Sequence, residues 1–147
     1  MFSPQTEIFI QLVLAVVLGG FVGLEREWRR KEAGLRTHSL VCLGAALFTI
    51  VSIESVELFS PENIAFDPSR IVGQLVLGVG FLGAGVIIFR ERHVEGLTTA
   101  AGLWVTAAIG AAIGFHFYAI AVFAALLALL TFSVMKWFEG KLPRTES

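Results

Sequence analysis

The sequence is poor in charge and has almost no cysteine. Charged residues make up 16% of its 147 residues, against about 25% in an ordinary soluble domain. Cys42 is the single cysteine, so an intrachain disulfide is excluded. No Asp, Glu, Lys or Arg lies deep within a long apolar run. That absence weakens the case for a proton-coupled pump or a dedicated cation pathway, because such proteins place ionisable groups at membrane depth.

The motifs of common enzymes are also missing. The sequence contains no phosphate-binding lysine motif, and no nucleophile is paired with a base at a credible spacing. His38 has no clustered partner that would complete a metal site, and the acidic residues match no calcium-binding loop. We therefore expect no enzymatic activity, no cofactor, no bound metal and no nucleic-acid partner.

Five apolar stretches account for most of the chain. Hydrophobic residues reach 56% overall, and a helix that crosses a bilayer needs about 20 apolar residues. This pattern predicts an all-α fold, an integral membrane bundle of five transmembrane helices that occupies residues 1–138 as one domain. A short cytoplasmic tail follows over residues 139–147. The predicted helices cover residues 7–24, 37–53, 70–89, 97–115 and 117–135.

The basic residues are segregated along the chain and predict its orientation. Ten of the eleven Lys and Arg residues follow the first, third or fifth stretch, whereas the loop after the second is acidic. Loops rich in Lys and Arg are retained on the cytoplasmic side of a membrane. We therefore expect the N-terminus outside and the C-terminus in the cytoplasm. The first stretch has no basic residue before it, so we also expect no cleavable signal peptide.

The third stretch is rich in glycine. Gly78, Gly80 and Gly83 have the spacing of the glycines in a dinucleotide-binding loop. That loop must follow a strand, whereas these glycines lie within an apolar run. Small residues in membrane helices instead allow close helix packing. We expect Gly78, Gly80, Gly83 and Gly85 to form a helix–helix seam within or between subunits. Alternatively, they loosen the third helix so that freed carbonyls line a site.

The same argument applies to the first and fourth stretches, where small residues recur every four positions. Residues with this spacing share one face of a helix. We expect both faces to be packing seams, and we expect the bundle to form a homo-oligomer through glycine faces. The residues concerned are Gly19 and Gly23 in the first stretch and Gly102, Thr106, Gly110 and Gly114 in the fourth.

Two larger side chains within the apolar stretches are candidates for a packing or ligand-binding role. Gln74 is the clearest polar side chain of the third stretch, and we expect it to hydrogen-bond across a helix interface, or else to coordinate a ligand. Trp104 in the fourth stretch is expected to support packing within the bundle. Under the first interpretation of Gln74, both residues lie inside the bundle.

Charged and hydroxyl-bearing residues gather at the cytoplasmic ends of the predicted helices, and we call this group the charged mouth. All should lie at one membrane depth, where the N-termini of the second and fourth helices also favour anions. Two interpretations are open. The group forms a site for an ion, a lipid headgroup or a partner protein, or it consists only of snorkelling side chains and helix-end ion pairs. The charged mouth consists of Glu25, Arg26, Glu27, Arg36, Thr37, His38, Thr98 and Thr99.

Local patterns predict where these helices begin and end. Glu25 and Arg29 are spaced for an i,i+4 ion pair, so we expect the first helix to continue beyond its apolar stretch as far as Gly34. Hydroxyl side chains can cap the next helices. The expected caps are Thr37 or Ser39 for the second helix and Thr98 or Thr99 for the fourth.

Six stretches of the sequence form a recognisable pattern in a fixed order. They are residues 23–27, 33–48, 67–71, 74, 78–85 and 96–101, followed by Trp104. In these stretches the chain resembles the MgtC/SapB family of bacterial inner-membrane proteins. The resemblance implies a location in the bacterial inner membrane, a role linked to magnesium limitation and, in some pathogens, a part in virulence through survival inside host cells. Better-known members resemble regulators of other membrane proteins, including the proton-translocating ATP synthase, more than magnesium carriers.

The resemblance also sets the functional expectation. Longer members carry a soluble cytoplasmic domain after the last span, whereas this sequence ends at Ser147, so we expect the bundle and its charged mouth to carry the role. We expect a non-enzymatic regulator, in contact with membrane lipid, that binds another membrane protein or its own copy. The rival hypothesis is an oligomeric transporter or channel for an ion or small solute, which the glycine-rich third helix next to Gln74 favours.

Overall fold

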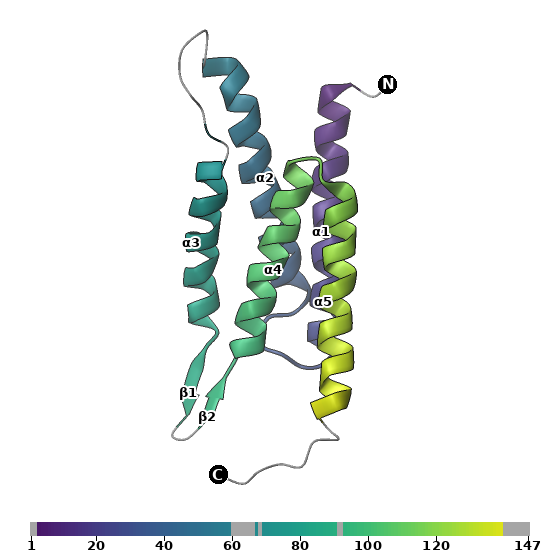
Figure 1. Cartoon of the computed structure of the whole chain (residues 1–147), viewed down its shortest axis with the longest axis vertical. Coiled ribbons are helices and arrows are strands. Elements are labelled where there is room, and N and C mark those ends of the chain that lie inside the picture. The colour runs from purple at the N-terminus through teal and green to yellow at the C-terminus, as the bar shows by residue number, and fades with distance from the viewer. Residues whose placement is uncertain (1–2, 60–66, 68, 91–92, 140–147) are drawn as a thin grey trace.

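The computed structural model describes residues 3–59, 67, 69–90 and 93–139, and over these ranges the chain forms five helices and one short β-hairpin. The elements are α1 (Pro4–Trp28), α2 (Leu35–Phe59), α3 (Ser69–Gly85), β1 (Ile88–Arg90), β2 (His93–Glu95), α4 (Leu97–Gly114) and α5 (Tyr118–Glu139). The helices stand side by side, and α3 lies at the edge of the bundle (Figure 1). The predicted helical fold is therefore confirmed.

Within the described residues, three helices are long and apolar enough to cross a membrane, namely α1, α4 and the segment Leu35–Ser55 of α2. The apolar segments of the other two helices are shorter, at Arg70–Gly85 in α3 and Tyr118–Val134 in α5. The protein is therefore a helical membrane protein, while the five-span count and the orientation stay predictions. Residues 60–66, 91–92 and 140–147, which contribute to the predicted orientation and tail, lie outside the described residues.

The third helix is shorter than the predicted range of 70–89. It ends at Gly85, and the chain then enters the hairpin, in which β1 and β2 are antiparallel and Ile88 lies opposite Glu95. The segment after Gly85 is rich in β-branched side chains, which fit a strand better than a helix. The prediction was wrong here because a continuous apolar run does not by itself distinguish helix from strand.

The fourth helix begins at Leu97, as predicted, but its predicted hydroxyl caps are wrong. Its N-cap is Gly96, with a φ of +87°, and no side chain caps the helix. Thr98 and Thr99 therefore lie inside the first turn of α4 rather than before it. Glycine is needed at the turn from β2 into α4, because a Cβ on Gly96 would also lie 2.9 Å from the carbonyl carbon of Val86.

The connection between α1 and α2 differs from its prediction as well. The first helix ends at Trp28 rather than near Gly34, and α2 begins at Leu35, before both expected hydroxyl caps. The backbone N–H of Leu35 instead donates a 2.8 Å hydrogen bond to a carboxylate oxygen of Glu27. A side chain at the end of α1 therefore satisfies one of the free N–H groups at the start of α2.

Glycines of α1 bring this helix into backbone contact with α2. A Cβ on Gly19 would lie 2.7 Å from the carbonyl oxygen of His38, and a Cβ on Gly23 would lie 2.7 Å from the carbonyl oxygen of Gly34. Real Cβ atoms essentially never come within 3.0 Å of another heavy atom in this way. Only glycine permits this approach, so the predicted packing notch on the first helix is confirmed.

The glycines of α4 bring this helix close to α2 as well. A Cβ on Gly110 would lie 3.0 Å from Ala45 Cβ, and a Cβ on Gly114 would lie 2.6 Å from Thr49 Cβ. Gly102, at the other end of the stripe, faces Phe132 of α5. The predicted stripe is therefore a seam within the bundle. Its neighbourhood is the main apolar core, which includes Ala15, Val22, Cys42, Ala46, Ile109, Ile113 and Ala121.

The glycines of α3 do not form such a seam within the chain. A Cβ on Gly78, Gly80 or Gly85 would meet nothing within 4 Å, and of the four predicted positions Gly83 alone packs, 3.6 Å from Ala100 Cβ. A seam within the chain is therefore absent at three of the four positions, while a seam between subunits stays a prediction. The alternative of a loosened helix is wrong, because α3 is helical from Ser69 through to Gly85.

The seams predict a sharp contrast between two glycines. Gly110→Ala should lower the stability of the bundle by roughly 1–3 kcal/mol, because its methyl group would enter the α2–α4 contact. Gly73→Ala is the matched control, since a Cβ there meets nothing within 4 Å. It should leave stability unchanged or raise it by up to about 1 kcal/mol through helix propensity. Thermal unfolding in detergent measures both, and equal midpoints for the two variants would contradict the seam.

Candidate functional site

The eight residues of the charged mouth belong to three helix ends that lie together at one end of the bundle. The end of α1 and the starts of α2 and α4 meet at the lower end of Figure 1. The structure therefore brings the predicted residues to one depth. It also divides them, because some are buried in contacts between helices and others are exposed on the surface.

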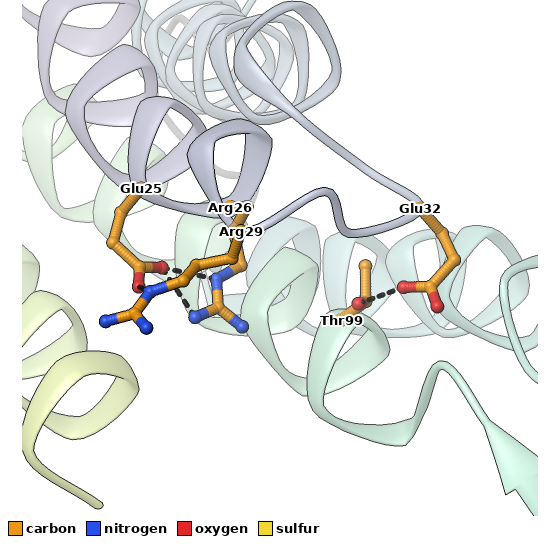
Figure 2. Close-up of polar contacts among 5 residues, drawn as sticks. All are labelled: Glu25, Arg26, Arg29, Glu32 and Thr99. Atoms are coloured by element: carbon orange, nitrogen blue, oxygen red, sulfur yellow. Dashed lines mark hydrogen bonds and ion pairs between the residues drawn. The ribbon is translucent and has the colours of Figure 1, made fainter. Parts of the chain in front are cut away.

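Arg26 is the buried cation of the charged mouth. Its side chain is 3% exposed, and its Nε donates a 2.6 Å hydrogen bond to Glu25 Oε2 (Figure 2). The guanidinium lies 3.8 Å from the ring centroid of Phe132 in α5. Glu25 also pairs with Arg29 at 3.2 Å, which confirms the predicted i,i+4 pair. The carboxylate and the aromatic face offset the cost of burying this charge, and the contact joins α1 to α5.

Thr99 joins the start of α4 to the connection between α1 and α2. Its hydroxyl is buried and donates a 2.5 Å hydrogen bond to Glu32 Oε2 (Figure 2). This bond is the main reason that the pKa of Glu32 lies below its ordinary value, and the nearby charges of Lys31 and Arg26 lower the pKa further. The carboxylate therefore stays ionised and keeps accepting the bond from Thr99.

His38 is fully buried between α1 and α4. Its Nδ1 lies 3.0 Å from the carbonyl oxygen of Gly34, and since a carbonyl only accepts, the proton belongs on Nδ1. Its Nε2 has no hydrogen-bond partner among the described residues and lies 3.5 Å from where a Cβ of Gly102 would stand. In the part of the chain that the structure describes, no three His, Cys, Asp or Glu side chains form a group that could hold a metal ion.

The remaining members of the charged mouth are exposed. Arg36 and Thr37 lie in the first turn of α2, and Thr98 lies in the first turn of α4. Arg36 makes no ion pair within the described ranges, in contrast to Arg26 and Arg29 at the same end of the bundle. These exposed groups, rather than the buried ones, are available to a ligand or a partner.

Gln74 and Trp104 do not occupy the positions that were expected of them. Gln74 is exposed on α3 and makes no hydrogen bond with any described residue, so the predicted bond across a helix interface is absent within the chain. The alternative, in which Gln74 coordinates a ligand, stays a prediction. Trp104 is 51% exposed on α4, so it does not serve as a packing residue of the interior. Neither side chain is buried in the interior of the bundle.

An open groove of about 840 Å³ runs between α2 and α3, and we call it the α2–α3 groove. Arg36 and Thr37 lie at one end of it, and Ser55 and Gln74 lie at the other. The walls between these ends are mainly apolar. They include Leu40, Val41, Gly44, Ala45, Phe48 and Val51 from α2 and Leu75, Gly78, Val79 and Leu82 from α3.

Sequence reasoning missed two residues that hold the bundle ends in place. Gln11 of α1 is 1% exposed, and its Nε2 donates a 2.8 Å hydrogen bond to the carbonyl oxygen of Ile113, at the end of α4. The signal was present, since Gln11 is an amide inside an apolar stretch and such a group needs a partner in lipid. Glu32 was also missed, although it is an acid next to three consecutive basic residues.

Comparison with known proteins places the chain in a family. The sequence profile of the MgtC family matches residues 12–141. The chain belongs to the MgtC family. The resemblance that was read from the motifs is thereby confirmed. No solved structure shows a significant match to the chain.

Relatives from three bacteria illustrate the relationship. The chain is 47% identical over 129 residues to "Putative magnesium transporter YhiD" of Escherichia coli (strain K12), a match that covers 87% of this chain and 60% of that protein. It is 43% identical over 120 residues to "Protein MgtC" of Salmonella typhimurium (strain LT2), covering 82% and 48%. An uncharacterized protein of Haemophilus influenzae is 41% identical over 152 residues, covering 98% and 64%. The chain thus spans about half to two thirds of the length of these relatives.

The bond between Thr99 and Glu32 predicts a pH-dependent loss of stability. Because the folded pKa of Glu32 is lowered, its contribution is present above the ordinary pKa of 4.5 and is lost as the pH falls through the folded value. Thr99→Val should therefore unfold at a lower temperature than the wild type near neutral pH, and the gap should close below pH 4.5.

Thermal unfolding in detergent across this pH range measures the gap, and Thr98→Val is the matched control. Thr98 is exposed and is adjacent to Thr99 on the same turn. The control should follow the wild type at every pH. A gap between Thr99→Val and the wild type that stays constant with pH would contradict the assigned role of Glu32.

Proposed function

We propose that this MgtC-family chain is a multi-pass protein of the bacterial inner membrane that acts as a non-enzymatic regulator linked to magnesium limitation. It works by docking against another membrane protein or its own copy. Family membership supports the link to magnesium, since one relative bears the name of a magnesium transporter. The docking mechanism is supported by the outward face of α3.

The outward face of α3 is the observation that carries the proposal. Gly73, Leu77, Gly80 and Ala84 recur at spacings of three and four, so they share one side of the helix, and all four are exposed. A Cβ on Gly73 or Gly80 would meet nothing within 4 Å. In lipid, small residues on a helix face permit the close approach of a second backbone, and dispersion then stabilises the contact. A helix of another membrane protein fits this face.

The charged mouth would adjust the contact rather than create it. Arg26, His38 and Thr99 are buried and keep the helix ends in register. Thr98 and the exposed end of α2 offer hydroxyl and guanidinium groups to a partner at the membrane surface. Charged groups at such a rim influence the rate of encounter and the choice of partner more than the affinity.

The rival function, an oligomeric transporter or channel, keeps two supporting observations. The α2–α3 groove carries Gln74, Ser52 and Ser55 on its walls, and the name of YhiD refers to magnesium transport. The core between α1, α2 and α4 is closed by glycine seams and buried apolar side chains. A transport path would therefore have to run along the α2–α3 groove, with another subunit closing its open side. Saturable magnesium uptake into liposomes that contain only this protein would favour the rival.

The docking surface predicts that Gly80→Leu disrupts function without unfolding the bundle. The added side chain would hold a partner helix away from α3 and weaken capture by about tenfold. The first measurement is photocrosslinking in native membranes, with immunodetection of the membrane subunits of ATP synthase and of a second, tagged copy of this chain. The second measurement is growth in low magnesium. ATP synthase is the first partner to probe because the family resemblance implies it.

Gly78→Leu is the matched control for this experiment. It lies two residues away on the same helix, with the same open space around its Cβ, but it faces the α2–α3 groove. It should keep both crosslinks. If Gly80→Leu left crosslinking and growth unchanged at equal protein level, the docking face would be wrong.

A further inference from the structure

The α2–α3 groove is long. On α2 it runs from Arg36 to Ser55, which is about 28 Å along the helix axis. Its volume is about 840 Å³, and its walls are mainly apolar side chains of α2 and α3. An extended hydrocarbon chain has the length and the apolar character to lie along it.

The polarity of the groove changes along its length. From Arg36 to Phe48 the walls are mainly apolar over about 18 Å, which is close to the roughly 15 Å thickness of one leaflet of the hydrocarbon core. Polar groups then appear, and Ser52 has a buried hydroxyl with no hydrogen-bond partner among the described residues. Leu40 and Phe48 are 66% and 65% exposed on the apolar wall. An apolar ligand of one leaflet's length would cover them.

A cation lies at the start of this apolar wall. Arg36 lines the groove, is exposed and pairs with no carboxylate in the described part of the chain. It stands in the first turn of α2, where backbone N–H groups without helical acceptors favour an anion. Guanidinium groups bind phosphate through two parallel hydrogen bonds. The groove therefore combines a phosphate-binding end with an acyl-binding trough.

We propose that the α2–α3 groove binds an anionic phospholipid, with its phosphate at Arg36 and one acyl chain along the apolar wall between α2 and α3. The second acyl chain stays in the bilayer. The lipid comes from the leaflet on the side of the α2 N-terminus. This site uses a different face of α3 from the docking surface, so its test does not depend on the proposed function.

Native mass spectrometry of the purified chain in a mild detergent tests the site, with phosphatidylglycerol and zwitterionic phosphatidylethanolamine as probes. One phosphatidylglycerol should remain bound per chain, in preference to phosphatidylethanolamine. Arg36→Gln should weaken its binding by about tenfold, because a charge-assisted hydrogen bond is lost. Gly78→Leu should abolish it by filling the trough. Excess inorganic phosphate should not displace the lipid, since the acyl chain supplies much of the affinity.

Two matched controls separate this site from general lipid contact. Lys31→Gln removes a cation from the same end of the molecule, and Gly80→Leu adds the same side chain to a glycine of α3 outside the groove. Both should bind phosphatidylglycerol as the wild type does. Equal binding of both lipids, or equal loss in the controls, would indicate annular lipid only and overturn the site. If the wild type bound no lipid and instead formed a dimer that Gly78→Leu disrupted, a second copy of the chain would occupy the groove, and the proposal would be overturned.

Discussion

The close approach of α2 to both α1 and α4 is the constraint on which the rest of the structure depends. In lipid, helices gain little from hiding apolar surface from water, so their association relies on dispersion and weak contacts that act only at short range. Gly19 and Gly23 remove the side chains between α1 and α2, and Gly110 and Gly114 do the same between α4 and α2. Because α2 is held from two sides, its first turn has a fixed position at the end of the bundle.

That fixed position explains how the charged mouth is organised. Burying Arg26 would be costly by itself, but Glu25 and the ring of Phe132 compensate for the lost hydration and bring α5 against α1. The bond from Thr99 to Glu32 holds the connection before α2 against α4. These buried contacts place Arg36 on a rigid element rather than on a loose loop. A ligand that binds there loses less free energy to ordering the protein.

The sequence was sufficient for the helices and for the seams, but not for the partners of each face. A repeat of small residues every four positions indicates that another backbone comes close, and for Gly110 that backbone is α2. A repeat of the same kind includes Gly80, which has no neighbouring backbone within the chain. The repeat by itself does not say which helix comes close. The hairpin after Gly85 and the buried bond of Gln11 were missed for different reasons. The first looked like more apolar helix, and the second was a polar residue inside an apolar run that was passed over.

The edge helix α3 has three faces with three different surroundings. Gly83 is buried toward the bundle, Gly78 lines the α2–α3 groove, and Gly80 faces outward. Direct contact between α2 and α3 is limited by the groove, so an acyl chain in it would supply part of the packing that the protein leaves out. Because the groove and the docking face lie on different sides of α3, a substitution in one leaves the other free, and the two sites can be tested separately.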